Sequence, residues 1–556
     1  MSGAANSYVS GAADAPLLSD TVGAALARTV ERFPDREALV SIHQNVRLTY
    51  REFASEVERV ALGLLALGIE KGDRVGIWAP NCVEWAILQF ASARVGAILV
   101  NINPAYRAGE FEFAMAHSNV RMLVMTARFK TSDYLEMLAS VRPALTGLER
   151  VVTIDGDRAS ATDLVWSDLG EAATGARREQ LAAREQLLDA DDPINIQYTS
   201  GTTGRPKGAT LTHHNIVNNA HAMAGILGYT DADRVCIPVP LYHCFGMGVG
   251  NLGCVTTGAT MVYPAASFEP VATMQAVQDE RCTSLYGVPT MWIAQLEHPR
   301  FDEFDLTSLR TGLMGGSPCP IEVMKRAVSD MHASEVCIVY GMTETAPISF
   351  ITRPDDSLER RVSTVGRVMP NVEAKVIDPL TGDLVDVGTA GEVCTRGYVV
   401  MRGYWDDPKA TTEAVDAEGW MHTGDLGVLD DEGYLNIVGR IKDMVIRGGE
   451  NLFPREIEEV LFQHPAVGSA QVIGVPDALM GEELMAWVVA RDGATVNEDD
   501  LRAFCATRLA HFKVPRYWHF VDEFPMTVTG KVQKFKMREI AIESLGLREA
   551  AAIKTA

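Results

Sequence analysis

The sequence predicts an α/β protein, with a large N-terminal domain of layered β-sheets and helices followed by a small α+β C-terminal domain. Short apolar runs alternate with longer amphipathic runs through the first four-fifths of the chain. Several of the short runs are β-branched and almost continuously apolar, as is typical of strands that are covered on both faces. The C-terminal fifth instead has the order helix, strand, strand, helix. This change of pattern favours two domains.

The strands expected in the first part lie between helical patterns. They are Pro193–Tyr198, Val235–Val239, Thr260–Tyr263, Ser284–Val288 and Val336–Tyr340. The longest apolar stretch, residues 83–100, is interrupted by Glu84 and Arg94, which is unfavourable for a membrane span. We expect this stretch to be a buried helix that runs into a strand.

The C-terminal part contains its own helix signals. Pro454 suits a first helical turn, and Asn497 could cap a second helix. Strands are expected between these helices at Ala470–Val475 and Leu484–Ala490. A Gly- and charge-rich stretch, Gly439–Asp443, marks the boundary. We therefore expect domains at residues 17–439 and 444–549, joined through residues 440–443.

Composition excludes several classes of partner. The 556 residues carry a formal net charge of −23, and such an acidic surface repels nucleic acid and anionic membranes. The nine cysteines include no C-x-x-C pair, which is typical of a reduced protein without a disulfide framework or a zinc site. The first twenty residues contain no Lys or Arg, unlike signal and transit peptides. We expect a cytoplasmic location and no membrane span.

The strongest local signal is the segment from Tyr198 to Gly208, YTSGTTGRPKG, directly after an expected strand. Its glycines allow the backbone to curl and to point N–H groups at an anion. Its other anion-binding candidates are hydroxyl or cationic side chains, namely Thr199, Ser200, Thr202, Thr203, Arg205 and Lys207. It is not a Walker A loop, because Pro206 precedes the lysine and no Gly-Lys-Ser/Thr ending is present. The segment predicts a phosphate-binding loop.

This loop resembles the signature loop of the adenylate-forming superfamily, which contains acyl-CoA synthetases, luciferases and adenylation domains of peptide synthetases. Further segments resemble the family in the same order along nearly the whole chain: residues 241–246 (acyl pocket), 315–318 and 340–345 (adenine and metal), 423–425 (ribose), 439–443 (hinge) and 525–531 (catalytic lysine). Segments 446–451, 511–515 and 531–536 carry a closer resemblance to medium-chain acyl-CoA ligases of the acyl-CoA synthetase family member 2 group.

The resemblance implies an AMP-forming acid–thiol ligase with the adenylate-forming enzyme fold. Such an enzyme joins a carboxylic acid to AMP with release of pyrophosphate and then transfers the acyl group to coenzyme A, using ATP and Mg²⁺. The implied catalytic residues are Lys531, His243, Thr343 and Glu344, with Glu344 as the Mg²⁺ ligand. Lys442 and Asp443 are the implied hinge of a mobile C-terminal domain.

The implied nucleotide and coenzyme A contacts are spread over both domains. They comprise Thr199, Ser200, Gly201, Thr202, Thr203, Gly204, Lys207, Gly315, Gly316, Ser317, Tyr340, Gly341, Met342, Thr343, Asp425, Arg440, Gly448, Gly449, Glu450 and Lys531. By resemblance, Tyr340 stacks on adenine, and Asp425 accepts hydrogen bonds from the ribose with Arg440 beside it.

The candidate acyl pocket is apolar, which suits an alkyl or aromatic acid. Its members are His243, Phe245, Met247, Tyr286, Val288 and Met342. By resemblance, His243 gates or orients the carboxylate. A long-chain type of relative carries a tryptophan at the position of Met247, so its absence favours a medium-chain acid.

Other interpretations compete with this one. A fatty-acyl-AMP ligase that loads a carrier protein is the main alternative; a luciferase-like oxygenase and an inactive binding module are weaker ones. The run from Gly248 to Gly253 matches G-x-G-x-x-G, but we expect close helix packing there rather than dinucleotide binding. His213 and His214 are expected to begin a helix rather than to bind a metal. A homodimer is the default expectation for the assembly.

Overall fold

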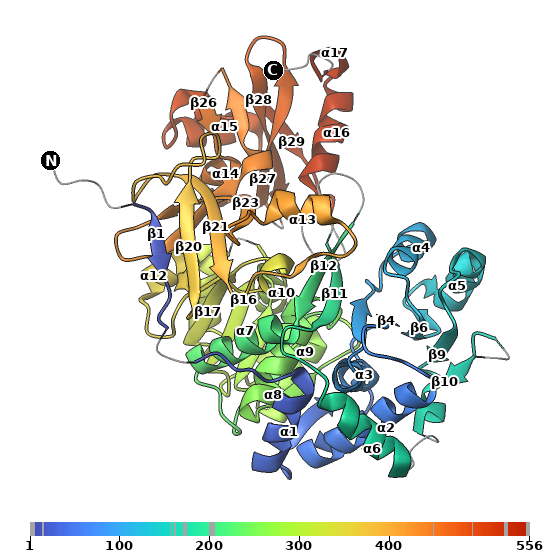
Figure 1. Ribbon diagram of the computed structural model, residues 1–556. Coiled ribbons are helices and arrows are strands. Elements are labelled where there is room, and N and C mark those ends of the chain that lie inside the picture. Colours follow the sequence, from blue (N-terminus) through green and yellow to red (C-terminus); the bar gives the residue numbers. More distant parts are fainter. Residues whose placement is uncertain are drawn as a thin grey trace. The chain divides into compact units, whose positions relative to one another are not determined.

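The structure is a computed structural model that describes residues 6–13, 16–156, 158–160, 163–170, 175–199, 206–317, 319–448, 450–491, 493–526 and 532–551. The chain divides into two compact units (Figure 1). The larger unit contains Val9–Ala374 and Thr395–His422, and the smaller unit contains Met1–Tyr8, Lys375–Cys394 and Thr423–Ala556. Among the described residues, no helix has both the length and the apolar character that spanning a bilayer requires.

The larger unit is built on two sheets. The nine-stranded sheet has the order β19 (Arg367–Val368), β18 (Phe350–Ile351), β17 (Glu335–Tyr340), β16 (Thr311–Gly315), β15 (Ser284–Gly287), β13 (Arg234–Cys236), β14 (Thr260–Tyr263), β2 (Glu37–Ser41) and β3 (Val46–Thr49). The eight-stranded sheet has the order β10 (Leu164–Val165), β9 (Arg150–Thr153), β6 (Met122–Met125), β4 (Arg74–Trp78), β5 (Ile98–Asn101), β11 (Pro193–Thr199), β12 (Lys207–Thr212) and β22 (Gly403–Tyr404). A two-stranded ribbon pairs β7 (Arg128–Phe129) with β8 (Ser132–Asp133).

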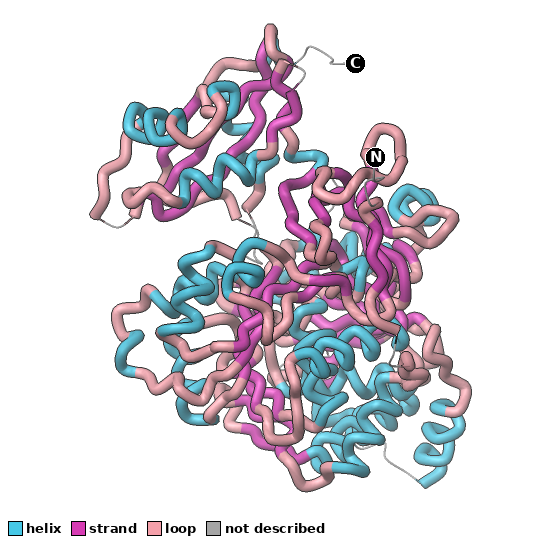
Figure 2. Tube along the Cα trace, turned by 90° about the vertical axis from the view of Figure 1, so that its left-hand side faces the viewer, coloured by secondary structure: helices cyan, strands magenta, loops and turns pink. Residues whose placement is uncertain are grey.

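Helices flank these sheets, as Figure 2 shows for the larger unit. They are α1 (Val22–Arg32), α2 (Tyr50–Ala66), α3 (Val83–Val95), α4 (Ala108–His117), α5 (Tyr134–Val141), α6 (Gly175–Glu185), α7 (His213–Ile226), α8 (Gly253–Thr257), α9 (Pro270–Glu280), α10 (Pro289–Leu296), α11 (Ile321–Ser329), α12 (Leu358–Ser363) and α13 (Pro408–Ala414). One core cluster joins β15, β16 and β17 to α9, α10 and α11. Another joins β4, β5 and β6 to α4 and α5. Both sheets are therefore buried, as their apolar strands predict.

A third sheet has the order β1 (Tyr8–Ser10), β20 (Val372–Ile377), β21 (Gly391–Gly397), β23 (Met421–Leu429) and β24 (Leu435–Arg440). The C-terminal sheet consists of β26 (Glu450–Leu452), β25 (Val445–Arg447), β28 (Gly481–Ala490), β27 (Val467–Asp477) and β29 (Tyr517–Phe520). Its helices are α14 (Pro454–Phe462), α15 (Glu498–Ala506), α16 (Lys534–Ser544) and α17 (Arg548–Ala551). Alternate residues of β27 enter two separate cores, one with α14 and α15 and one with α16.

Most sequence expectations for individual elements are confirmed. The run 83–100 is helix α3 followed by β5, His213 begins α7, and Asn497 caps α15 by accepting from the Asp500 N–H. The strand expected at Val235–Val239 is shorter, because β13 ends at Cys236. Pro238 and Pro240 follow and have no N–H to donate to a sheet ladder. The chain therefore leaves the nine-stranded sheet earlier than its apolar character suggested.

Candidate functional site

Three neighbouring parallel strands end beside one another at the centre of the candidate site. β15, β16 and β17 pair in parallel, with Gly287 opposite Met314 and Gly315 opposite Val339. The carboxyl ends of parallel strands share one edge of a sheet, which is where ligands bind in open α/β folds. The residues that follow each strand therefore gather at this edge: Val288 after β15, Gly316 and Ser317 after β16, and Gly341 to Glu344 after β17.

Two glycines at this edge are required by the backbone. Gly316 has φ +88°, in the left-handed region. A Cβ at Gly341 would lie 1.9 Å from the Pro347 carbonyl oxygen, so no other residue fits there without moving that backbone. Tyr340, the last residue of β17, is half-buried, and its ring centroid is 6.2 Å from that of Phe350. The sequence prediction named residues 340–345 and 315–318 as two separate segments. The pairing of β16 with β17 brings the two segments together.

Glu344 is a buried carboxylate on the 3₁₀ turn Thr343–Thr345, with 5% of its surface exposed. Its Oε1 accepts hydrogen bonds from the Tyr404 hydroxyl at 2.9 Å and from the Thr199 hydroxyl at 3.4 Å. Thr199 ends β11 and Tyr404 ends β22, so the eight-stranded sheet supplies both donors. Burial first, and then the nearby charge of Glu344, raise the pKa of Tyr404, which keeps its hydroxyl protonated as a donor.

The surroundings of Glu344 fit a divalent cation. Among the described residues, Glu344 forms no ion pair, and its hydrogen bonds go to Oε1 alone. A buried carboxylate without a cationic partner is costly unless a positive charge is supplied. Carboxylate oxygen is also the type of ligand that Mg²⁺ prefers. The residues present therefore fit the metal that the sequence prediction assigned to Glu344.

The predicted phosphate loop is anchored beside Glu344. Thr199 pairs with Lys207 across the antiparallel strands β11 and β12, and the Lys207 ammonium lies 4.9 Å from the centre of the Tyr404 ring. The loop residues Ser200, Gly201, Thr202, Thr203, Gly204 and Arg205 lie outside the described residues. The described ends of the loop place the Thr199 hydroxyl on the carboxylate and the Lys207 ammonium over the ring of Tyr404, which also contacts the carboxylate.

The pocket segment, which we define as residues 241–252, includes a π-helix at Phe245–Leu252. π-Helical turns are rare and occur often at functional sites. Phe245 stacks on the buried Tyr286 of β15 with ring centroids 5.6 Å apart, and Met247 is 1% exposed. The glycine run of this segment is helical instead of joining a strand to a helix, so the expectation of helix packing is confirmed. Gly246 packs so closely that a Cβ would lie 2.3 Å from the Pro240 oxygen.

His243 begins the turn that leads into this π-helix. Its Nδ1 accepts the Phe245 N–H at 3.1 Å, so the proton of a neutral imidazole lies on Nε2. The Sγ of the adjacent Cys244 is 3.8 Å from the Thr343 hydroxyl. This contact places the pocket segment directly against the segment that carries Glu344. Met342, just before Thr343, is half-buried at the same strand end.

In the smaller unit, Asp425 and Arg440 form an ion pair. They are opposite each other on β23 and β24, and the Arg440 Nε donates to Asp425 Oδ1 at 3.0 Å. Asp425 is 8% exposed, whereas the Arg440 side chain is 58% exposed. Lys442 and Asp443 follow on a 3₁₀ turn, Ile441–Asp443. The structure therefore brings together the two residues that the sequence prediction assigned to the ribose.

The predicted coenzyme A segment is a short hairpin of β25 and β26. Arg447 pairs with Glu450 across it, and Gly448 has φ +59°, while Gly449 lies outside the described residues. Arg447 is fixed by an ion pair to Glu483 at 2.8 Å. Lys531 also lies outside the described residues, but Met526 and Val532 on either side of its loop form an antiparallel bridge.

Sequence reasoning missed Tyr404. It lies 60 residues from Glu344 on a strand of two residues, and no phosphate-loop or strand pattern includes it. The one available signal is an aromatic residue after a glycine in the run MRGYW, which has no specific meaning by itself. Sequence reasoning also passed over several polar residues inside apolar runs, among them Gln89 within residues 83–100.

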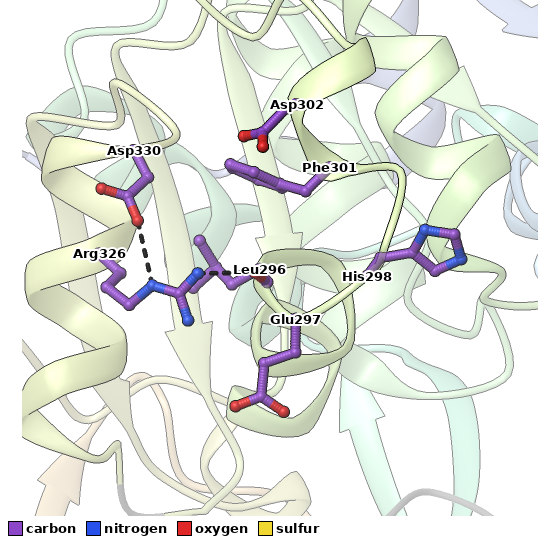
Figure 3. Close-up of a pocket in the computed structure, with 7 residues that line it drawn as sticks. All are labelled: Leu296, Glu297, His298, Phe301, Asp302, Arg326 and Asp330. Carbon is purple, nitrogen blue, oxygen red and sulfur yellow. Dashed lines mark hydrogen bonds and ion pairs between the residues drawn. The ribbon is translucent and has the colours of Figure 1, made fainter. Parts of the chain in front are cut away.

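A separate cavity of about 440 Å³ contains none of the predicted site residues (Figure 3). Its lining residues are Leu296, Glu297, His298, Phe301, Asp302, Arg326 and Asp330. Arg326 spans one side of it, donating to Asp330 at 3.0 Å and to the Leu296 carbonyl at 2.6 Å. The cavity lies at the C-terminal ends of α10 and α11, which run back from the site edge of the sheet. It therefore lies at the other edge of the sheet.

Comparison with known proteins agrees with this geometry. The AMP-binding enzyme family matches residues 26–405, and the AMP-binding enzyme C-terminal domain matches residues 456–531. The putative acyl-CoA synthetase YngI of Bacillus subtilis (strain 168) is 46% identical, with 96% of this chain and 99% of that protein covered. The mitochondrial medium-chain acyl-CoA ligase ACSF2 of Danio rerio is 44% identical, with coverage of 97% and 91%.

Solved structures confirm the predicted fold. The anthranilate CoA ligase AuaEII in complex with anthranoyl-AMP superposes with a TM-score of 0.84 at 27% identity, covering 96% of this chain and 99% of that one. ATP-bound MatB from Rhodopseudomonas palustris gives a TM-score of 0.80 at 30% identity, with coverage of 95% and 100%. With matches of this extent in both sequence and fold, the chain belongs to the AMP-binding enzyme family, as one of its acyl-CoA synthetases.

Proposed function

We propose that this acyl-CoA synthetase activates a medium-chain fatty acid with ATP and Mg²⁺ and passes the acyl group to coenzyme A. The observation that carries the proposal is the contact between Cys244 and Thr343, which joins the apolar pocket segment to the turn bearing the buried Glu344. An apolar acid and a metal-bound nucleotide would thus be held side by side. The names of the curated relatives, which include medium-chain acyl-CoA ligases, support the same substrate class.

In the first half-reaction, a carboxylate oxygen forms a bond to the α-phosphorus of ATP, and the bond to pyrophosphate breaks. Two anions must approach, so the site has to supply cations and N–H donors. Glu344 would hold Mg²⁺, which supplies positive charge to the phosphate oxygens. Lys207 and the predicted contacts of residues 199–204 would bind the phosphates, and Thr343 would touch the α-phosphate. The proton on His243 Nε2 would orient the carboxylate.

In the second half-reaction, the coenzyme A sulfur bonds to the acyl carbon, the thiol proton leaves, and AMP departs with its oxygen. We assign Asp425 and Arg440 to the ribose and the Gly448–Glu450 hairpin to coenzyme A. Lys531 would serve the first half-reaction only, by neutralising charge at the α-phosphate. This separation needs a hinge, which we place at Lys442 and Asp443.

The hinge can be tested with Lys442→Pro, which would fix φ near −65° and remove a backbone donor. We expect this variant to slow one half-reaction more than the other. Unchanged rates for both would place the hinge elsewhere. Its control is Lys442→Ala, which leaves the backbone free.

The medium chain length of the acid is inferred from two features of the pocket segment. Phe245 packs against Tyr286 in an apolar environment, and Met247 stands where long-chain relatives carry a tryptophan. Cytoplasmic location and a homodimer also stay predictions. The names of the vertebrate relatives place those proteins in mitochondria. Fractionation of native cells would test the location, and light scattering would test the assembly.

The proposed function is tested by mass spectrometry after incubation with ATP, Mg²⁺, coenzyme A and a panel of linear, branched and aromatic acids. We expect acyl-CoA in highest yield from medium-chain linear acids. Highest yield from an aromatic or long-chain acid would contradict the proposed substrate class. Formation of acyl-AMP without acyl-CoA would contradict coenzyme A as the acceptor. It would instead favour a fatty-acyl-AMP ligase that loads a carrier protein.

A further inference from the structure

The pocket segment and the residues just before it are held by buried side-chain amides. The Asn81 amide donates to the Val239 carbonyl at 3.0 Å, and its oxygen accepts the Leu241 N–H at 2.8 Å. Asn101 donates to the Tyr242 carbonyl at 2.9 Å. Gln89 donates to the Met247 carbonyl at 2.9 Å. Each of the three side chains belongs to a residue that is 3% exposed.

Two of these amides end longer chains of hydrogen bonds. In the first relay, Gln197 donates to Asn195 at 2.7 Å, and Asn195 donates to Asn101 at 2.9 Å. In the second relay, Tyr263 donates to Asn251 at 2.7 Å, and Asn251 donates to Gln89 at 2.8 Å. Each amide oxygen accepts the bond from the preceding member, which leaves its NH₂ group to donate onward. Both relays therefore direct a donor at a main-chain carbonyl.

The relays are built from groups that would be costly to bury for packing alone. Asn195, Asn251 and Tyr263 are fully buried, and Gln197 is 3% exposed. Buried polar groups of this kind are unfavourable unless every bond is made, and a satisfied network fixes one arrangement of its members. Hydrocarbon side chains would fill the same space at lower cost. The network is thus better explained by what it positions than by stability.

The two carbonyls at the ends of the relays flank His243. Tyr242 directly precedes it, and Met247 is the residue whose N–H donates to the His243 carbonyl at 3.1 Å. The first relay also starts beside the nucleotide side of the site, because Gln197 and Thr199 point to the same face of β11. Thr199 contacts Glu344, as described above. One strand face thus touches both the pocket segment and the metal carboxylate.

We propose that Asn101 and Gln89 are positioning residues for His243, which hold the pocket segment where the carboxylate of the acid binds. This role rests on the proposed function of His243 and concerns residues that do not touch the substrate. Loss of either amide removes the side-chain donor to a carbonyl of the pocket segment. The segment then shifts, and binding of the acid weakens more than binding of ATP.

The test compares Asn101→Leu and Gln89→Met, which keep the side-chain size and remove the donor, in the full-length enzyme. The matched control is Asn218→Leu. Asn218 is also 3% exposed and also holds a backbone, that of Leu18, through bonds of 2.9 and 2.7 Å. It lies on α7, and the hydrogen bonds of its side chain go to Leu18, before α1, and to His214, not to residues 239–247. ATP–pyrophosphate exchange gives KM for the acid and KM for ATP separately.

We expect KM for the acid to rise at least about tenfold in both relay variants, with KM for ATP within about twofold of wild type. Asn218→Leu should lower the melting temperature and leave both KM values unchanged. Equal changes in the two KM values, or an unchanged KM for the acid, would overturn the positioning role. If Asn101→Leu does not fold, Gln89→Met alone decides. A wild-type enzyme that forms no acyl-AMP with any acid would instead overturn the proposed function itself, and the relay role with it.

Discussion

The candidate residues of the two units differ in how the fold holds them. In the larger unit, Glu344, Met247 and Tyr286 are buried, and each has defined contacts to neighbouring strands or helices. In the smaller unit, Asp425 is buried and paired with Arg440, but Lys442, Gly448 and Glu450 are exposed. A buried group has its geometry fixed within its own unit, so its chemistry can be judged from distances. An exposed group reveals its role only when a substrate or another surface meets it, and kinetics must supply what geometry does not.

The largest effect that separates the two units is expected for Lys531→Ala. A unit charge about 4 Å from the phosphate contributes roughly 4 kcal/mol at an effective dielectric near 20, which corresponds to about a thousandfold in rate. We expect acyl-AMP formation to fall by this factor while supplied acyl-AMP is still converted to acyl-CoA. Rapid-quench assays of the two half-reactions measure this. Equal losses in the two half-reactions would mean that Lys531 serves both steps. Lys531 would then not differ in this respect from the buried residues of the larger unit.

A slightly smaller loss is expected for Glu344→Gln. The amide keeps the shape and can still accept from Tyr404 and Thr199, but it loses the negative charge that would hold Mg²⁺. We expect acyl-AMP formation to fall about a hundredfold to a thousandfold, with partial recovery at high Mg²⁺ concentration. Mg²⁺ titration of pyrophosphate release gives the result. An unchanged Mg²⁺ dependence would place the metal ligand at another residue.

Burial also predicts a pH effect on stability in the larger unit. His213 is fully buried and accepts the Val22 N–H at 3.0 Å, and burial lowers its pKa from 6.5 to about 4. Between pH 6.5 and pH 4 the unfolded chain binds a proton at His213 that the folded chain does not bind. The contribution of His213 to the free energy of unfolding is therefore fully present above pH 6.5 and is lost as the pH falls towards 4. The loss amounts to about 3 kcal/mol. Urea unfolding at several pH values should show this dependence, and His213→Gln should reduce it.

The smallest effect is expected for Tyr404→Phe, which removes one donor to Glu344 and keeps the ring beneath Lys207. Residues that orient a metal ligand typically contribute 10- to 100-fold to metal affinity or activity. We expect an apparent Mg²⁺ affinity lowered by about tenfold. Tyr398→Phe is the control, since Tyr398 is a buried tyrosine in the same unit and, among the described residues, its hydroxyl donates no hydrogen bond to Glu344. An effect of the same size in both variants would mean that Tyr404 acts through packing alone.

Much of the fold follows from local pattern, because a strand covered on both faces must be apolar along its length. β14 has the predicted bounds, and β11 and β15 differ from theirs by one residue. β13 shows where apolar pattern alone fails. The apolar run continues past Cys236, but the strand ends there because Pro238 has no N–H to donate to the sheet. Residues within one motif, such as Thr343 and Glu344, could also be proposed as site residues from the sequence. They lie close in sequence, so a pattern can contain them.

Contacts between distant segments were not predictable in this way. Tyr404 meets Glu344 only because β22 pairs with β12, a pairing that no local signal encodes. The relays were missed for the same reason, as their members span residues 89 to 263. One signal was present: Asn195, Gln197 and Thr199 alternate in an otherwise apolar strand. Polar residues on one face of a buried strand require partners, and this predicts a network without identifying its other members.

The amide-held carbonyls have a consequence for how this enzyme could change its substrate. A strand end is fixed by a ladder of backbone bonds that almost any sequence can make, so the edge formed by β15, β16 and β17 tolerates changes of side chain except at its closely packed glycines. The path of residues 239–247 depends instead on the identity of a few side chains. Single substitutions at Asn81, Gln89 or Asn101 would change the backbone path of residues 239–247. The carboxyl ends of β15, β16 and β17 would keep their positions. Acid selectivity can thus evolve, or be engineered, independently of nucleotide chemistry.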